Sequence, residues 1–176
     1  DPTKAMTLHF KEKGDVIFVL GSIHNDIHAS EYLHKLKQVT YSPVPYFNMD
    51  EEFALQKAVS SFIQQGLLQS AHDISEGGLV ITLLESAFAG NKGFLVNAAY
   101  SIRNDAFWFG EAQGRGVVSV NEGKQVLFVK VCETMDIPYL HLGIVTDSKL
   151  TIQGEEWGDI ADWKNLYDTA IEKISG

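Results

Sequence analysis

The sequence predicts a fold of the α+β type, layered as in α/β proteins, in which helices pack on a mixed β-sheet. Two continuous apolar runs, Val16–Leu20 and Gly116–Val120, have the composition of strands that are buried on both faces. A helical stripe of apolar side chains follows Gly78, at Val80, Leu84, Ala87 and Phe88. Because strand-like and helix-like segments do not alternate strictly, a doubly wound parallel sheet is disfavoured.

Two further helices, joined by an extended connection, are expected before Gly78. Ser30 is the expected N-cap of a short helix over 31–36. Two prolines favour an extended segment over 39–47. Asn48 or Asp50 caps the next helix, whose apolar stripe consists of Phe53, Leu55, Ala58, Val59, Phe62 and Ile63.

The second half of the chain is richer in predicted strands. Residues 93–99 have the pattern of a strand, and 125–135 the pattern of a helix. The segments 139–145 and 149–152 are predicted to pair as a hairpin. A closing helix is expected over 159–174, with inward-facing side chains at Ile160, Trp163, Leu166, Ala170 and Ile171.

Composition places the chain among ordinary globular domains. It has 176 residues, of which 45% are hydrophobic and 21% charged, so we expect residues 1–176 to form one domain. No apolar run approaches the roughly 20 residues that cross a bilayer, so no membrane partner is expected. A single cysteine, Cys132, cannot form an internal disulfide, and we expect a buried thiol in a cytoplasmic protein.

The charge balance argues against nucleic acid as a partner. The formal net charge is −9, from 14 basic and 23 acidic residues. The two arginines, Arg103 and Arg115, lie in no basic run, whereas binding to a nucleic-acid backbone needs clustered cations. The first residue is Asp1 rather than Met, so the chain is expected to be a piece of a longer protein.

The strongest candidate site is the turn Ser75-Glu76-Gly77-Gly78 at the start of a predicted helix. Two adjacent glycines leave the backbone bare, and the first N–H groups of a helix attract a phosphate. Ser75 adds a hydroxyl donor, and His72 beside Asp73 resembles a general base with its orienting acid. The alternative is a plain capped turn in which the glycines supply positive φ.

A second candidate cluster lies at 110–115, where Glu111, Gln113 and Arg115 stand among glycines just before a predicted strand. This segment is either a polar loop that faces a substrate, with Arg115 neutralising a phosphate, or an ordinary turn with a surface ion pair. Three histidines upstream lack a Cys-x-x-Cys partner motif, so we expect no metal site.

Four segments together resemble the synthetase subunit of phosphoribosylformylglycinamidine synthase. Residues 70–79, Ser-Ala-His-Asp-Ile-Ser-Glu-Gly-Gly-Leu, resemble that family's Ala-His-Asp-x-Ser-Asp-Gly-Gly-Leu. Residues 109–115, Phe-Gly-Glu-Ala-Gln-Gly-Arg, are similar to its Phe-Gly-Glu-Ser-Gln-x-Arg. Residues 14–21 with 30–32 resemble its Gly-Asp strand followed by Gly-Ser-Glu-Tyr, and 142–145 its Ile-Gly-x-Val strand. The four lie in the family's order over nearly the whole chain.

The resemblance implies a C-terminal domain of the aminoimidazole ribonucleotide synthetase type. Such enzymes convert formylglycinamide ribonucleotide, ATP and glutamine-derived ammonia to formylglycinamidine ribonucleotide in purine biosynthesis. ATP and Mg²⁺ would be held mainly by a preceding domain, and this chain is expected to bind neither tightly and to be inactive alone. The implied partners are that N-terminal synthetase domain, a glutaminase and a small subunit.

The resemblance also assigns roles to individual residues. It places the 5′-phosphate of the ribonucleotide on Ser75, Gly77 and Gly78, with His72, Asp73, Gln113 and Arg115 as further residues lining the site. The chain departs from the family pattern in four places: Glu76 replaces Asp, Ala112 replaces Ser, Gly116 interrupts an apolar run, and His28-Ala29 replaces Gly-Gly.

Two other functions stay open from the sequence. One is a domain of another member of this superfamily, such as aminoimidazole ribonucleotide synthetase, selenophosphate synthetase or thiamine-monophosphate kinase. The 109–115 segment favours the amidotransferase synthetase over these. The other is a stand-alone binding module that forms a homodimer through exposed sheet edges.

Overall fold

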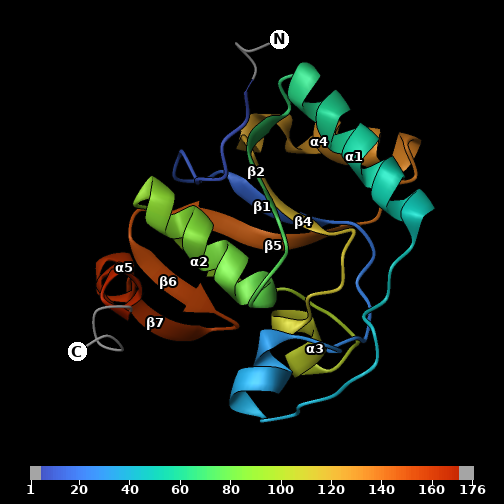
Figure 1. The fold of residues 1–176 in the computed structure, drawn as a ribbon. Coiled ribbons are helices and arrows are strands. Elements are labelled where there is room, and N and C mark those ends of the chain that lie inside the picture. Colours follow the sequence, from blue (N-terminus) through green and yellow to red (C-terminus); the bar gives the residue numbers. More distant parts are fainter. Residues whose placement is uncertain (1–4, 171–176) are drawn as a thin grey trace.

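The computed structural model describes residues 5–170, which form a seven-stranded mixed sheet with helices on both faces (Figure 1). The strand order is β2-β4-β1-β5-β3-β6-β7. Every neighbouring pair is antiparallel except β3 with β6, so the predicted mixed sheet is confirmed. The strands are β1 (Val16–Leu20), β2 (Leu68–Asp73), β3 (Gly93–Val96), β4 (Gly116–Val120), β5 (Tyr139–Thr146), β6 (Lys149–Ile152) and β7 (Glu155–Asp159).

The helices divide between the two faces of the sheet. They are α1 (Met49–Gln64), α2 (Gly78–Gly90), α3 (Asn104–Phe109), α4 (Gln125–Thr134) and α5 (Ile160–Asp168), with a π-helical turn η2 (Tyr32–Leu36) and a 3₁₀ turn η3 (Glu122–Lys124). The side chains of β1 alternate between two hydrophobic clusters, as the period of a strand requires. Ile17 and Val19 pack with α2 on one face. Val16, Phe18 and Leu20 pack with α1 and α4 on the other.

Helix starts follow the predicted capping chemistry. The Asn48 side chain accepts the N–H groups of Asp50 and Glu51 at 2.9 and 3.3 Å, so Asn48 is the cap of α1. The Ser30 hydroxyl accepts the N–H of Leu33 at 3.3 Å, but the short helix that follows is of the π type and begins at Tyr32, so Glu31 rather than Ser30 stands at its cap position. The segment 39–47 has no helix or strand, as predicted.

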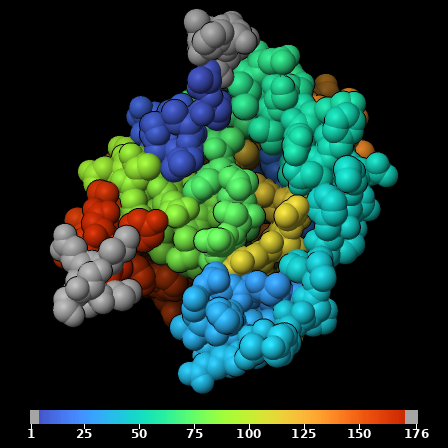
Figure 2. Space-filling view, viewed as in Figure 1, coloured from blue at the N-terminus to red at the C-terminus, as the bar shows by residue number. Residues whose placement is uncertain are grey.

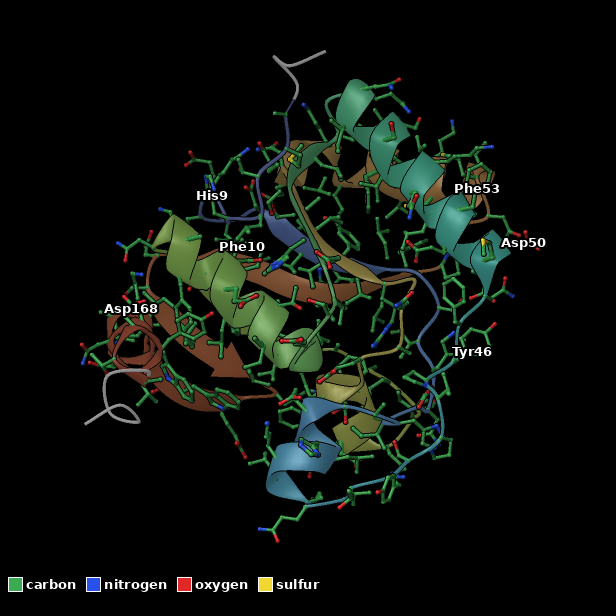
Figure 3. The ribbon with its side chains drawn as sticks, viewed as in Figure 1. His9, Phe10, Tyr46, Asp50, Phe53 and Asp168 are labelled. Carbon is green, nitrogen blue, oxygen red and sulfur yellow. The ribbon has the colours of Figure 1, made fainter. Side chains whose placement is uncertain are left out.

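Three residues of the predicted apolar stripes are exposed. Phe53 lies on the outer side of α1 (Figure 3) and is 57% exposed, because the face of α1 that meets the sheet is narrower than the apolar stripe. In α5, Leu166 and Ala170 are also exposed, and only Ile160 is fully buried among the predicted residues that the structure describes. The helix ends at Asp168, and the predicted Ile171 lies outside the described residues.

The predicted hairpin of 139–145 with 149–152 was wrong, although both strands exist. β3 lies between them, antiparallel to β5 and parallel to β6. The turn at 147–148 crosses over the start of β3 at Gly93, where a Cβ would run into the Lys149 carbonyl oxygen and the Thr146 hydroxyl. A glycine at this position therefore allows β3 to enter between two strands that are close neighbours in sequence.

Two strands and one helix were missed. β2 is an edge strand of mixed polarity, and the buried hydroxyl of its Ser70 lies 2.6 Å from the buried hydroxyl of Ser119 on the neighbouring β4. β7 carries Glu155 and Glu156 on the opposite edge, where charged side chains discourage pairing with other chains. α3 was missed because it has only six residues, too few to show an apolar period in the sequence.

Candidate functional site

A pocket of about 810 Å³ lies between α1 and the neighbouring edge of the sheet. Its walls are the inner face of α1, the segment 71–76 and the loop that contains Glu111 and residues 113–116. Figure 2 shows the surface hollowed here, between the teal helix α1 and the green segment that leads into α2. A volume of this size suits a small-molecule ligand.

The two clusters that the sequence singled out meet at this pocket. His72, Asp73 and Ser75 border it from one side, and Gln113 and Arg115 border it from the other. This meeting follows from the pairing of β2 with β4, which sets Asp73 opposite Gly116. The predicted glycines of the turn lie at the start of α2, just beyond the lining residues.

Gly77 and Gly78 have a structural reason to be glycine. Their φ angles are +82° and +69°, in the left-handed region that L-residues rarely adopt. A Cβ on Gly78 would lie 2.7 Å from the backbone of Phe109, and one on Gly77 would run into the side chain of Ile81. The turn therefore has the positive φ of the plain-turn alternative, and the bare backbone also packs directly on the 109–111 segment.

The N–H groups of the two glycines already have acceptors within the protein. The Gly77 N–H donates to Glu111 Oε1 at 2.9 Å, and the Gly78 N–H donates to the Ser75 carbonyl at 3.0 Å. A carboxylate oxygen thus lies at the start of α2, where the helix dipole favours negative charge. Ser75 itself is exposed, and no hydrogen-bond partner of its hydroxyl occurs within residues 5–170.

His72 and Asp73 do not act on one another, because successive side chains of a strand point to opposite faces. The His72 ring lies on the α2 side of the sheet, where its Nδ1 is 3.2 Å from the Ser86 hydroxyl. Its Nε2 lies 3.5 Å from a carboxylate oxygen of Glu85, also on α2. Asp73 is exposed at the pocket, so the predicted general-base pair is wrong as a pair.

Arg115 braces its own loop. Its side chain is buried, with Nε donating to the Ala112 carbonyl at 3.2 Å and Nη2 donating to the Gly110 carbonyl at 2.7 Å. Burial lowers the pKa of Arg115, and the negative charge of Asp26 opposes that effect. The guanidinium is committed to these carbonyls rather than turned toward a ligand.

Glu111 is the site residue that sequence reasoning left without a role. Its Oε1 accepts the N–H of Gly77 at 2.9 Å and the N–H of Glu31 at 2.8 Å. Its partners are 34 and 80 residues away along the chain, and no pattern in the sequence around Glu111 predicts such a contact. The sequence signals were its place in the polar 110–115 cluster and in the 109–115 segment that resembles the family.

The pocket is acidic at its rim and apolar at its floor. The carboxylates of Glu52, Asp73, Glu76 and Glu111 border it, against the single guanidinium of Arg115. Leu55, Val59, Ile63 and Val118 supply the apolar floor. Carboxylates accept hydrogen bonds from hydroxyl and amide groups, so the arrangement suits a ligand rich in such donors.

No metal site arises in the part of the chain that the structure describes. Among residues 5–170 there is no group of three or more His, Cys, Asp or Glu side chains that could hold an ion. The His24 and Tyr46 rings pack with centroids 3.9 Å apart and planes inclined by 33°, and His28 Nδ1 lies 3.0 Å from a carboxylate oxygen of Asp26. The Cys132 thiol is fully buried, and burial raises its pKa to about 12, so it is not a reactive nucleophile.

None of the helices described has the length and apolar character that crossing a membrane requires.

Comparison with known proteins places this chain in a family. The model of the family described as AIR synthase related protein, C-terminal domain, matches residues 12–155. Phosphoribosylformylglycinamidine synthase subunit PurL of Thermoanaerobacter sp. (strain X514) is 35% identical over 174 residues, which are 99% of this chain and 23% of that protein. The chain thus spans about a quarter of the length of this relative.

Two solved structures share the fold. Thermotoga maritima PurL complexed with FGAR matches with a TM-score of 0.76 at 16% identity, over 92% of this chain and 30% of that one. Thiamine-monophosphate kinase from Stenotrophomonas maltophilia K279a matches with a TM-score of 0.62 at 18% identity, over 88% of this chain and 54% of that one. The chain belongs to the family of AIR synthase related proteins and represents their C-terminal domain.

Proposed function

We propose that this chain is the substrate-binding domain of a phosphoribosylformylglycinamidine synthase. The proposed reaction converts formylglycinamide ribonucleotide, ATP and glutamine-derived ammonia to formylglycinamidine ribonucleotide. The observation that carries the proposal is the meeting of the 70–79 and 109–115 segments at one pocket, since these two segments carry the family resemblance. The relative in Thermoanaerobacter bears this enzyme's name, and the similar Thermotoga structure is a complex with FGAR.

The proposed position of the substrate phosphate is the turn of Ser75, Gly77 and Gly78. Ser75 offers an exposed hydroxyl, and the two glycines give the turn its shape and bring no side chain to shield it. Asp73 and Gln113 are exposed at the pocket and are proposed to form hydrogen bonds with the ribose and the amide of the substrate. The Asp73 carboxylate accepts such bonds, and the Gln113 amide both donates and accepts them. His72 and Arg115 are proposed to support these walls from behind.

The nucleotide and the metal have no place in the chemistry that we assign to this domain. ATP and Mg²⁺ belong to the proposed full-length enzyme, but the described residues offer no group that fits a metal ion. We therefore assign no step of the reaction to a metal held here. The proposed partners are the remaining part of the synthetase, a glutaminase and a small subunit, in the cytoplasm, and this chain alone is proposed to be inactive.

Two other functions are less well supported. The match to thiamine-monophosphate kinase shows that the fold is shared by enzymes of different activity, so fold alone does not select among them. The Phe109–Arg115 segment, which borders the pocket and resembles the amidotransferase synthetase, favours the proposed reaction. A homodimerising module would show self-association and no affinity for the ribonucleotide.

Calorimetric titration of formylglycinamide ribonucleotide into the chain tests the proposal. Ser75→Ala is the informative variant, because it removes one hydroxyl without disturbing the backbone of the turn. Valine at Gly77 or Gly78 is unsuitable, since a Cβ there strains the fold whatever the ligand. Saturable binding that weakens about tenfold in Ser75→Ala is expected, as one charge-assisted hydrogen bond is lost.

The matched control is Ser101→Ala, at an exposed serine outside the pocket. Equal affinity of all three proteins would exclude the phosphate position.

A further inference from the structure

One carboxylate oxygen joins two distant segments beside the pocket. Glu111 Oε1 accepts the N–H of Gly77, at the start of α2, at 2.9 Å. The same oxygen accepts the N–H of Glu31, just before η2, at 2.8 Å. Hydrogen bonds from backbone N–H groups to a carboxylate are stronger than those between neutral groups. Glu111 is therefore the direct link between these two segments.

Aromatic and backbone packing reinforce the same junction. The Tyr32 ring stacks on Phe109, with ring centroids 4.7 Å apart and planes inclined by 14°. The backbone of Phe109 lies directly against Gly78, close enough that a Cβ there would be 2.7 Å away. Ser30 is fully buried, and its hydroxyl donates to the Ile27 carbonyl at 2.8 Å. The segment Ser30-Glu31-Tyr32 is thus fixed on one side of residues 109–111, and the start of α2 on the other.

Glu111 borders the pocket, whereas Glu31 and Tyr32 are not among its lining residues. We infer that Glu111 is a positioning residue, which holds the turn of Ser75 to Gly78 in its binding conformation by joining it to the segment Ser30-Glu31-Tyr32. The inference rests on the proposed function, because the ligand whose binding it supports is the ribonucleotide proposed for that turn. The inference gives Glu31 and Tyr32 a role in binding although neither residue lines the pocket.

The negative charge of Glu111 has the opposite effect, because it repels a phosphate at the neighbouring turn. Two substitutions separate these effects. Glu111→Gln keeps a side-chain oxygen that accepts the two N–H groups but removes the charge. Glu111→Ala removes both. Positioning predicts that the Gln variant binds at least as tightly as the parent and that the Ala variant binds about tenfold more weakly.

Two measurements on the 176-residue chain test the inference. Amide hydrogen exchange, followed by NMR, reports on the N–H groups of Gly77 and Glu31 without any ligand. Exchange of both is expected to accelerate together in Glu111→Ala and to stay slow in Glu111→Gln. Calorimetry with formylglycinamide ribonucleotide then gives the affinities. The matched control is Glu122→Ala, at an exposed glutamate of η3 outside the pocket.

Tyr32→Ala serves as a second route to the same conclusion, because it loosens the segment from Phe109 and leaves Glu111 intact. It is expected to weaken binding although Tyr32 does not border the pocket. Unchanged exchange in Glu111→Ala, or equal or tighter binding by that variant, would overturn the inference. If the parent itself fails to bind, the proposed function falls, and the exchange data still decide whether Glu111 holds the turn.

Discussion

Ala29 adopts a backbone conformation that is unfavourable for an L-residue. Its φ is +51°, and it stands where the family pattern has glycine. Its side chain is exposed, and its N–H donates to the Ser42 hydroxyl at 2.6 Å, so the backbone is held in this conformation by a neighbour. The left-handed conformation costs an L-residue roughly 1–2 kcal/mol, which glycine avoids at the expense of greater freedom in the unfolded chain.

Ala29→Gly is therefore expected to raise the free energy of unfolding by up to about 1 kcal/mol. Chemical denaturation of the variant measures this gain. Ala54→Gly is the matched control, because Ala54 is exposed within α1, where glycine is expected to cost about 0.5–1 kcal/mol. Losses of equal size at both positions would show that the Ala29 conformation carries no strain.

Asp15 is a buried carboxyl whose pKa is raised, chiefly by burial, with a further contribution from the charge of Glu12. The Glu12 N–H donates to it at 3.2 Å, and this bond and the charge of Lys11 oppose the shift. A raised folded-state pKa means that the folded protein binds the proton more tightly than the unfolded chain. Stability from this group is thus present below its ordinary pKa and is lost as the pH rises through the folded-state pKa.

Asp15→Asn is expected to raise the melting temperature at pH 7, because asparagine keeps an oxygen for the Glu12 N–H and carries no charge. The gain should shrink as the pH falls toward the ordinary carboxyl range near 3.8. Thermal unfolding of both proteins between pH 3.5 and pH 7 measures the difference. A gain that is independent of pH would point to packing rather than to the buried charge.

At the scale of elements, the turn between β5 and β6 depends on Gly93. A Cβ at Gly93 would meet backbone atoms of the turn, including the carbonyl carbon of Ser148 at 2.6 Å. Gly93→Ala is expected to lower the free energy of unfolding by about 3 kcal/mol, because backbone must shift to admit the methyl group. Urea denaturation measures the loss. Gly123→Ala, in the exposed 3₁₀ turn η3, is expected to be nearly neutral, because its Cβ would meet only the Asn121 side chain at 3.3 Å and no backbone.

The pattern of apolar residues along the sequence predicted an element well where the whole element is buried among apolar neighbours. β1 and β4 are buried apolar runs, and both were predicted with the bounds that the structure shows. β2 was missed because its sequence, Leu-Gln-Ser-Ala-His-Asp, mixes polar and apolar residues at a sheet edge. Pairing was harder still, since the insertion of β3 between β5 and β6 depends on contacts between residues that are 47 to 56 positions apart along the chain.

The candidate site divides in the same way. Spacing and residue type pointed to both the Ser75 turn and the 110–115 loop, but only the register of β2 on β4 brings them to one pocket. The side to which His72 points also follows from that strand, which the sequence did not predict. The role of Glu111 was not predicted, because both of its partners are distant in sequence.

At the scale of the whole molecule, the pocket lies between α1 and the sheet, so a ligand there binds the folded chain and not the unfolded one. Formylglycinamide ribonucleotide at one hundred times its Kd is therefore expected to raise the free energy of unfolding by about 2.7 kcal/mol. Thermal shift over a range of concentrations measures this. Ser75→Ala should need a higher concentration for the same shift, and a shift in the parent that does not grow with concentration would contradict specific binding.

The central position of β1 has a consequence during synthesis of the chain. Of the strands described here β1 is synthesised first, yet its two neighbours in the sheet, β4 and β5, begin at Gly116 and Tyr139. At a synthesis rate of roughly 5–20 residues per second, an apolar pentapeptide waits on the order of ten seconds before either partner exists. Apolar side chains that stay exposed during folding favour aggregation and chaperone binding, so both are expected at this segment during that time. The run Val16–Leu20, which is the clearest strand in the sequence, is thus also the one that waits longest for a sheet partner among the strands of residues 5–170.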